Sequence, residues 1–538
     1  MTFQPRKAVF KPTLAPMLAK SLNPQTPEEY NAALASMTSF LGEIGKSIST
    51  PWTPDFLPEF LQKASTFAQS GSATTGLTYY DLELGAKFLY PVLTPLRNEI
   101  PRVSGKGGIQ ANWRAVTAIN STGLRLGVSG GNRGGVQAVS SANYSAAYKG
   151  IGIETSVDFE AQYAGMGFDD IKAIGAKVGL ESCMLGEELL LLGGNGDYLL
   201  GQTGTPTVAD VGTGGTLAAN LVVSVICVGL SLDGYVNGTV VGGIQGSITR
   251  TNADGSSDTF GGGAAKQSAA GAVTTANDGN ATHSVTASVA AQVGAVGYAW
   301  FWGLAGAEVL GAITSINSTI ILATATGTQT AASLGVADNS VNSLVFDGLI
   351  YLALTAGSGA YVSAFATGTA GTGTTLTGDG AGGIVEIDAA LKDRWDHYKL
   401  SPDTMWVSSQ VAQDISKKIL AGQTNAAQRF VFESEQSALG GGIMVRTYLN
   451  KFSMAGASVI NIRIHPNMPP GCILMTARSI PYPLSNVGNV MQVRTRQDYY
   501  QIEWPLRARR YESGVYADEV LQHYFPPTLC FLYNIAPG

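Results

Sequence analysis

Charged residues are scarce in this chain of 538 residues. Lysine, arginine, aspartate and glutamate make up 13% of it, whereas about a quarter of an ordinary globular protein is charged. No lysine or arginine occurs from Gln267 to Leu391, where glycine, threonine, serine, alanine and valine predominate. An enzyme of this size normally spreads charge over its whole surface. This neutral block therefore argues against an enzyme and favours a structural protein that packs into an assembly and is displayed on its surface.

Basic residues are also in deficit over the whole chain. The formal net charge is −6, and a dedicated nucleic-acid binder needs a basic face that displaces counterions from the phosphates. The hydrophobic fraction of 45% is ordinary, which excludes disorder caused by low hydrophobicity. Low charge together with 67 glycines favours β-structure with many turns and extensive contact between subunits.

Cysteine is rare, and long hydrophobic runs are missing. Cys183, Cys227, Cys472 and Cys530 form no CxxC or metal-ligand spacing, and the four histidines form no HExxH motif, so we predict no metal site and no cofactor. Cys183 and Cys227 lie in apolar stretches, which predicts buried free thiols and favours a reducing compartment. The longest apolar run, residues 221–232, is far shorter than the ~20 residues that span a bilayer, so no membrane partner is expected.

Signatures of catalysis are weak. Residues 127–131 read Gly-Val-Ser-Gly-Gly, but no histidine lies in a motif that would support Ser129 as a nucleophile. The glycines between 371 and 380 lack a preceding strand and a following Lys-Ser/Thr, so a phosphate-binding loop is not predicted. We therefore predict no catalytic residue and expect that the chain is not an enzyme.

The N-terminal residues favour an extended arm followed by a helix. Residues 1–26 contain prolines at positions 5, 12, 16 and 24 and no acidic residue, and prolines at this density exclude a helix. The basic side chains of Arg6, Lys7 and Lys11 could contact nucleic acid, but a strap across an acidic neighbouring subunit is the favoured interpretation. Apolar residues at spacings of three and four predict a helix over 27–48.

Residues 104–150 have the pattern of a β-ribbon. Two β-like arms, residues 108–119 and 137–157, flank a glycine-rich tip at 129–135. Arms of about 20 residues would reach ~65 Å at ~3.3 Å per residue. A ribbon of that length would project onto another subunit, and we expect Trp113, Arg125 and Arg133 to lie in such a contact.

The clearest predicted helix covers residues 169–192. Two aspartates occupy its first turn, where carboxylates suit the positive end of the helix dipole, and glycines from Gly193 onward end it. Glycine within a helix costs up to ~1 kcal/mol, so we expect that Gly175, Gly179 and Gly186 are explained by close packing against a sheet.

Residues 206–333 contain short β-like runs that suggest a β-sandwich. Asp254-Gly255 supplies a hairpin turn between two of them. Residues 294–303, GAVGYAWFWG, resemble the tryptophan-bearing strand of immunoglobulin-like domains. Cys227 is the single cysteine of residues 206–333, so no disulfide can join the two sheets of this sandwich. Residues 355–383 are low in complexity, which predicts a long surface loop.

An ordinary α/β composition returns after residue 385. We predict helices over 386–398 and 411–420, strands over 405–408 and 460–464, and two strands after Met491. Five arginines near the C-terminus alternate with tyrosine and tryptophan. Such residues can hold nucleic acid, but arginine is also the preferred cation of subunit interfaces, and intersubunit contact is the favoured role of Arg494, Arg496, Arg507, Arg509 and Arg510.

The order of these segments resembles the major capsid proteins of tailed bacteriophages, whose fold is also found in encapsulin shells. Residues 144–165, 168–195, 384–420 and 494–535 carry the resemblance. It implies an α+β fold with an N-terminal arm, an extended β-loop, a spine helix in a peripheral domain, and an axial domain, here interrupted by the immunoglobulin-like sandwich. The expected division is 1–70 arm and helices, 71–103 entry segment, 104–150 ribbon, 151–205 peripheral domain, 206–333 inserted sandwich, 334–385 low-complexity return, and 386–538 axial domain and closing strands.

The resemblance implies that copies of the chain assemble into hexamers and pentamers of an icosahedral shell that encloses double-stranded DNA. The N-terminus has no long charged helical segment that could act as a fused scaffold, so a separate scaffolding protein is expected. The family also implies a portal protein at one vertex, leaves room for a decoration protein, allows only non-specific contact with packaged DNA, and places assembly in the host cytoplasm and the product in the virion. The alternative is a secreted or surface-displayed adhesive β-protein. The predicted helices and the missing export signal argue against this alternative.

Overall fold

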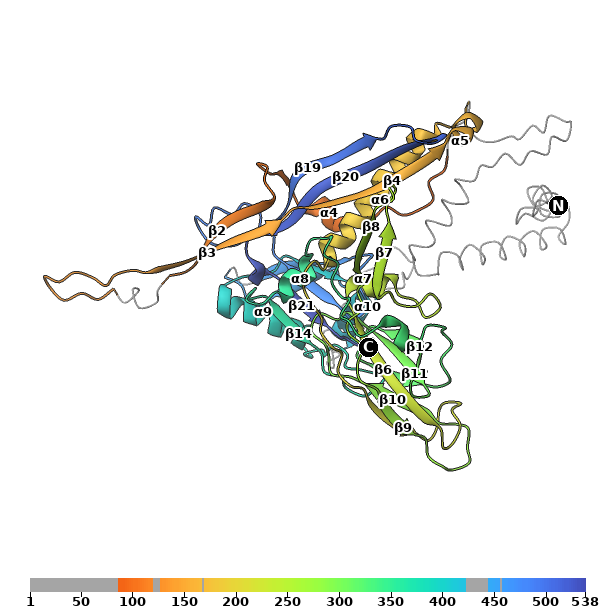
Figure 1. Cartoon of the computed structure of the whole chain (residues 1–538). Helices are drawn as coiled ribbons and strands as arrows, with labels where there is room; N and C mark the ends of the chain where they lie inside the picture. The colour runs from red at the N-terminus through yellow and green to blue at the C-terminus, as the bar shows by residue number, and fades with distance from the viewer. Residues whose placement is uncertain (1–85, 120–125, 167–168, 422–443, 455–456) are drawn as a thin grey trace, which may run out of the picture. The chain divides into compact units, whose positions relative to one another are not determined.

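The computed structural model describes residues 86–119, 126–166, 169–421, 444–454 and 457–538 (Figure 1). Its helices and strands confirm the predicted α+β fold class. The predicted N-terminal arm and the helix over 27–48 lie outside the described residues. So do Arg6, Lys7, Lys11 and Arg125.

A four-stranded sheet carries the long helix α6 (Ile171–Gly193) against two of its strands (Figure 1). The short strand at one edge of the sheet pairs in parallel with its neighbour, and the other two strand pairs are antiparallel. Two short helices, α4 (Pro95–Glu99) and α5 (Phe159–Ala164), pack beside α6. In sheet order the strands are β1 (Arg102–Ser104), β19 (Met491–Glu503), β20 (Arg510–His523) and β4 (Lys149–Asp158).

Helix α6 lies within two residues of its predicted bounds. The Asp170 carboxylate caps it by accepting hydrogen bonds from the backbone N–H groups of Lys172 and Ala173, at 3.1 and 3.2 Å, which satisfies amides that the helix itself leaves unpaired. A Cβ at Gly179 would lie 3.0 Å from Cγ2 of Thr155 on β4, so the predicted close packing on a sheet is confirmed there. It is wrong for Gly186, where a Cβ would meet no atom of the described residues within 4 Å.

Strands β2 (Gln110–Ile119) and β3 (Val139–Ala147) form the ribbon, paired from Gln110↔Ala147 to Ile119↔Val139. The predicted second arm over 137–157 is wrong in its length. The chain after Ala147 continues as β4, whose backbone pairs with β20 from Lys149↔Glu519 to Asp158↔Arg510. Because β4 gives its hydrogen bonds to the sheet, the paired ribbon is about 33 Å long at ~3.3 Å per residue, and its unpaired tip adds to that.

Two further sheets are built from residues 207–321 and share one buried cluster that includes Val225, Val285 and Trp300. Other side chains, Leu230 and Phe301 among them, are buried on the second face of the larger sheet. The smaller sheet has the order β13 (Ser318–Ile321), β10 (Ser284–Ser288), β5 (Thr207–Val211); the larger has β12 (Val309–Thr314), β11 (Gly297–Gly303), β6 (Val222–Leu230), β9 (Gly271–Thr274). The immunoglobulin-like assignment of this region stays a prediction.

Smaller elements complete this region. Strands β7 (Ser247–Thr251) and β8 (Ser257–Gly261) form a hairpin, and Gly255 in its turn has φ +87°, a conformation that favours glycine. The predicted Asp254-Gly255 turn is therefore confirmed. Also present are helix α7 (Leu232–Asn237) and the 3₁₀ turn η2 (Ala331–Leu334). Cys227 is free and buried, as are Cys183, Cys472 and Cys530.

The C-terminal part of the chain builds a six-stranded mixed sheet. Helices α9 (Val385–Tyr398) and α10 (Ser409–Ala421), both predicted, pack on it through one apolar cluster, and α8 (Leu349–Leu354) belongs to a second cluster shared with α6. The strand order is β14 (Tyr361–Ala364), β21 (Cys530–Tyr533), β18 (Ile473–Thr476), β15 (Thr404–Val407), β17 (Ser458–Ile464), β16 (Thr447–Asn450), with the 3₁₀ turn η4 (Pro526–Thr528) before β21.

The prediction of one long surface loop over 355–383 is wrong. Strand β14 lies within it and pairs in parallel with β21, and the side chains of Phe365 and Leu376 are buried. Two buried apolar anchors thus tie this glycine- and threonine-rich segment to the six-stranded sheet.

Candidate intersubunit surface

The β2–β3 ribbon exposes both of its faces. Nearly every residue of the two strands is exposed or half-buried, and residues 126–140, which include the tip, are all exposed. The ribbon is nevertheless not polar. Six of its aliphatic side chains are between 51% and 89% exposed: Val116, Ile119, Leu126, Val128, Val136 and Val139.

An isolated two-stranded hairpin is at best marginally stable in water, and an exposed apolar patch on a protein surface marks an interaction site. Here the apolar side chains lie along a β-pair with both edges unpaired within the described residues. Unpaired strand edges and apolar side chains both gain free energy when another chain covers them. The ribbon is therefore the surface of this chain best suited to bind a partner.

Trp113 anchors the base of the ribbon in its own chain. Its indole stacks on Tyr144 of β3, with ring centroids 5.8 Å apart, and meets Tyr524 edge to face at 5.9 Å. These are the offset and edge-on geometries that aromatic rings prefer. Arg133, by contrast, is exposed at the glycine-rich tip. Of the predicted contact residues on the ribbon, Arg133 is free to reach a partner, whereas Trp113 is half-buried.

The five C-terminal arginines do not form one continuous basic face. Arg496 pairs with Asp518 at 2.8 Å, Arg509 with Glu160 at 2.8 Å, and Arg510 with Glu512 at 2.9 Å. Arg494 is half-buried and donates to the Gln522 amide oxygen at 3.4 Å, and Arg507 is exposed near the end of the β19–β20 loop. With three of the five charges neutralised within the chain, phosphate binding by this segment is disfavoured. A role in subunit contact stays a prediction.

A buried ionic network lies where α4, α6, β1 and β19 meet, and sequence reasoning missed it. Arg102 pairs with Glu519 at 2.7 Å, with Asp498 at 2.8 Å, and with Glu187. Arg97 also pairs with Glu187, at 2.7 Å. Burial, and next the charge of Glu187, raise the pKa of Glu519 to about 7. Two arginines thus compensate three carboxylates, two of which are fully buried.

Tyr499 closes this network from β19. Its hydroxyl donates to Glu187, and its ring lies 5.2 and 5.0 Å from the guanidinium groups of Arg97 and Arg102, distances at which a cation is attracted to an aromatic face. Burial, and next the charge of Glu187, raise the pKa of the Tyr499 hydroxyl. Tyr499 thus supports the ionic network from within the chain.

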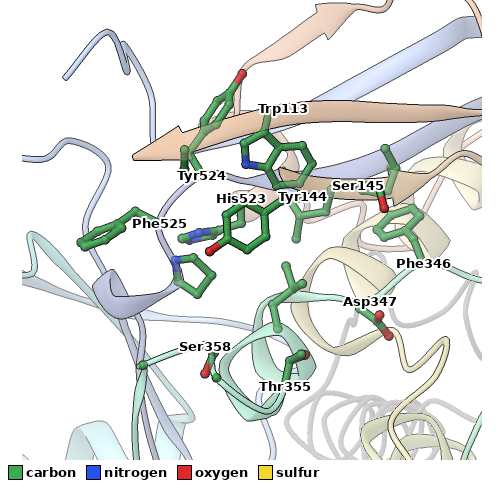
Figure 2. Close-up of a pocket in the computed structure, with 18 of the residues that line it drawn as sticks. Trp113, Tyr144, Ser145, Phe346, Asp347, Thr355, Ser358, His523, Tyr524 and Phe525 are labelled. Carbon is green, nitrogen blue, oxygen red and sulfur yellow. The ribbon is translucent and has the colours of Figure 1, made fainter. Parts of the chain in front are cut away.

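A ligand-sized cavity of about 650 Å³ opens at the base of the ribbon (Figure 2). Strands β2 and β3, the loop after α6, the loop after α8 and the end of β20 contribute to its wall. Figure 2 shows Trp113 and Tyr144 on one side and Asp347 and Thr355 on another, with His523 beside Tyr144. Both ring nitrogens of His523 and Nε1 of Trp113 are buried and have no hydrogen-bond partner among the described residues. Burial lowers the pKa of His523 to about 3.

The described residues contain no cluster of three or more histidine, cysteine or acidic side chains that could hold a metal ion. Ser129 at the ribbon tip accepts a hydrogen bond from the Asn132 side-chain amide at 2.6 Å, and an amide cannot act as the base of a nucleophilic serine. In the same parts of the chain, no helix is long and apolar enough to cross a membrane.

No protein-family model matches the sequence, and no curated protein matches it. Solved structures do. The capsid of Myoviridae phage XM1 is 11% identical, with 85% of this chain and 97% of that chain covered and a TM-score of 0.37. The capsid of an empty GTA particle is 9% identical, with 87% and 98% covered and a TM-score of 0.39. The capsid of cyanophage A-1(L) is 9% identical, with 86% and 98% covered and a TM-score of 0.38.

The chain is similar to phage capsid proteins over most of its length. The elements of the chain follow the order that the sequence resemblance implies: ribbon, long helix, two small β-sheets, and a mixed α/β unit, with β19 and β20 returning to the first sheet.

Proposed function

We propose that this protein is the major capsid protein of a tailed bacteriophage, a structural subunit that assembles into hexamers and pentamers of an icosahedral shell around double-stranded DNA. The exposed apolar β2–β3 ribbon carries this proposal. It presents six aliphatic side chains to solvent and leaves the strand edges unpaired in the described residues. Both features are costly for an isolated chain and favourable once another copy covers them.

The same proposal includes the partners that accompany such a shell: a separate scaffolding protein, a portal protein at one vertex, a decoration protein on the outside, and packaged DNA held by non-specific contact. The internal neutralisation of Arg496, Arg509 and Arg510 supports the last point, because it leaves little free basic charge for phosphates. The proposed location is the virion, after assembly in the host cytoplasm. The alternative of an adhesive β-protein is not favoured, since α6, α9 and α10 contribute side chains to two of the buried apolar clusters.

Electron microscopy and sedimentation of the full chain, expressed with and without its scaffolding protein, test the proposal. We expect closed shells. Val116→Asp and Val136→Asp, each a charge on the ribbon, should abolish shells while the circular dichroism of the subunit is unchanged. Val241→Asp is the matched control, because Val241 is 84% exposed but lies between α7 and β7. A wild-type chain that stays monomeric with the scaffold would overturn the proposal.

A further inference from the structure

The cavity at the ribbon base has unmet hydrogen-bonding capacity. His523 is 4% exposed, and neither of its nitrogens has a partner in the part of the chain that the structure describes, although an unpaired buried polar group costs roughly 1–3 kcal/mol. The indole N–H of Trp113, which lines the same cavity, is also unpaired within these residues. A volume of about 650 Å³ lies within the ~300–1,000 Å³ of ligand sites. Native structures rarely keep such groups together at an opening unless something binds there.

The cavity wall favours a cation. Asp197 and Asp347 both line it, against Lys149 as the one lysine or arginine of the wall, and the Lys149 ammonium already donates to the Ser343 carbonyl at 2.6 Å. Oδ1 of Asp347 accepts from the Gly196 N–H at 2.7 Å. Neither aspartate has an ion pair among the residues that the structure describes. Burial raises the pKa of Asp347 to about 6, and the nearby Asp197 charge adds to the rise.

The wall also contains several aromatic rings. Trp113, Tyr144, Tyr398, Tyr524 and Phe525 all line the cavity. Aromatic faces attract a guanidinium group both as a cation and as a flat surface to stack on. Carboxylates, a neutral imidazole that can accept a hydrogen bond, and aromatic faces together form the environment that an arginine side chain requires.

The ribbon tip offers such an arginine. Arg133 is exposed and stands in the sequence Gly-Gly-Asn-Arg-Gly-Gly, so small neighbours would let the backbone follow the side chain into the opening. Its own chain cannot place it there. Trp113 and Tyr144 face each other at the base of the ribbon, and the strands stay paired from there to Ile119↔Val139, about 20 Å further along at ~3.3 Å per residue. The tip would reach its own base only if this pairing broke.

We propose that the cavity bounded by Trp113, Asp347 and His523 receives Arg133 from the ribbon tip of a second copy of this chain. The inference rests on the proposed function, because it requires copies that associate, and it specifies which surfaces meet. Contact between a tip and a base joins two different surfaces of the chain. Such heterologous contacts close into rings when the rotation between copies permits, which is the symmetry that pentamers and hexamers need.

A peptide of residues 126–138 tests the docking apart from assembly. Isothermal titration of this peptide into the full-length, unassembled chain should show saturable binding. A peptide with Arg133→Ala should bind at least about tenfold more weakly, as expected for loss of a charge-assisted contact. On the protein, Asp347→Asn should weaken binding by a similar factor, since the amide keeps the acceptor for Gly196 but loses the charge. Asp396→Asn, which removes an exposed carboxylate from α9, is the matched control and should have no effect.

The full chain provides a second measurement. Arg133→Ala and Asp347→Asn should each raise the protein concentration needed for shell formation. The double variant should need no higher concentration than the more impaired of the two single variants, because both substitutions remove the same contact. Absence of peptide binding to the wild type, or binding that ignores both substitutions, overturns the docking proposal while leaving the proposed function intact if shells still form. Failure of the wild type to form shells or rings overturns the proposed function.

Discussion

The side chains of Glu188 and His465 are both fully buried and meet at 2.7 Å, from Oε1 to Nε2. The histidine accepts a hydrogen bond from the Asn467 N–H through Nδ1, at 3.1 Å, so Nε2 carries the proton and donates to the carboxylate. Glu188 also accepts from the N–H groups of Leu96 and Arg97, both at 2.8 Å. One carboxylate thus joins α6, the start of α4 and the chain that follows β17.

Removal of this carboxylate should be severely destabilising. Glu188→Ala leaves three hydrogen-bond donors without an acceptor, and each buried donor that loses its partner costs about 1–3 kcal/mol. Glu188→Gln should cost less, because its amide oxygen still accepts. The free energy of unfolding of the unassembled chain, from urea titration, measures both. Glu160→Ala removes an exposed partner of Arg509 and should cost at most about 1 kcal/mol; similar losses at both sites would refute the assignment.

The stability of the chain should fall as the pH rises through the range in which Glu519 ionises. Burial, followed by the charge of Glu187, raises the pKa of Glu519 to about 7, whereas an unfolded glutamate has a pKa near ~4.3. Between these values the folded state binds more protons than the unfolded state, so this group stabilises the fold below pH ~4.3 and ceases to do so above about 7.

Glu519→Gln should remove this slope, which for one group is at most ~1.4 kcal/mol per pH unit. Urea unfolding of the two proteins at intervals from pH 4.5 to 7.5 measures the difference. Parallel curves for wild type and variant would show that Glu519 is already ionised in the folded chain.

His283 forms a second pH-sensitive contact at the start of β10. Its ring is fully buried, with Nε2 2.9 Å from Asp278 and Nδ1 3.0 Å from Asp210. The hydrogen bond with Asp278, and next that with Asp210, raise the pKa of His283, and the bond from His283 lowers the pKa of Asp278 to about 2. A protonated ring can donate to both carboxylates, but a neutral ring can donate to only one.

The contact should therefore hold β10 at mildly acidic pH and weaken as the pH rises through the raised pKa of the histidine. It should also weaken toward pH 2, where Asp278 becomes protonated. We expect hydrogen exchange of residues 284–288, corrected for intrinsic rates, to show protection that declines above neutrality in the wild type. In His283→Gln the same protection should be lower and independent of pH in that range. If the protection of these residues in His283→Gln still depended on pH, a group other than His283 would be responsible for the pH dependence.

The parts of the fold that follow from the sequence are those with a local signal. Helix α6 begins at a capping aspartate and ends at a run of glycines, and α9, α10 and β17 carry a helical or alternating pattern. Partner choice has no such signal. Residues 137–157 alternate in the same way whether they pair with β2 or with β20, so the division into β3 and β4 becomes visible only when the distant strand is placed.

The buried ionic contacts of Glu187 and Glu188 could not be predicted from the sequence for the same reason. Glu187 and Glu188 stand in a helical segment in which adjacent acids usually face solvent. They are buried because Arg97, Arg102 and His465 reach them from far along the sequence. The cavity at the ribbon base is likewise assembled from six separated segments, and no one of them has a composition typical of a binding site.

Gly179 and Gly186, both inside α6, form a matched pair that separates packing from helix propensity. Alanine is favoured over glycine in a helix by up to ~1 kcal/mol. At Gly186 a Cβ would meet no atom within 4 Å in the described parts of the chain, so Gly186→Ala should raise the free energy of unfolding of the unassembled chain by about 0.5–1 kcal/mol. At Gly179 the Cβ would lie 3.0 Å from the Thr155 methyl group. That methyl group cannot rotate away freely, because Oγ1 of Thr155 donates to the Ser513 carbonyl at 3.0 Å. Gly179→Ala should therefore lower the free energy of unfolding, and stabilisation by both substitutions would show that β4 does not pack as closely on α6 as the structure indicates.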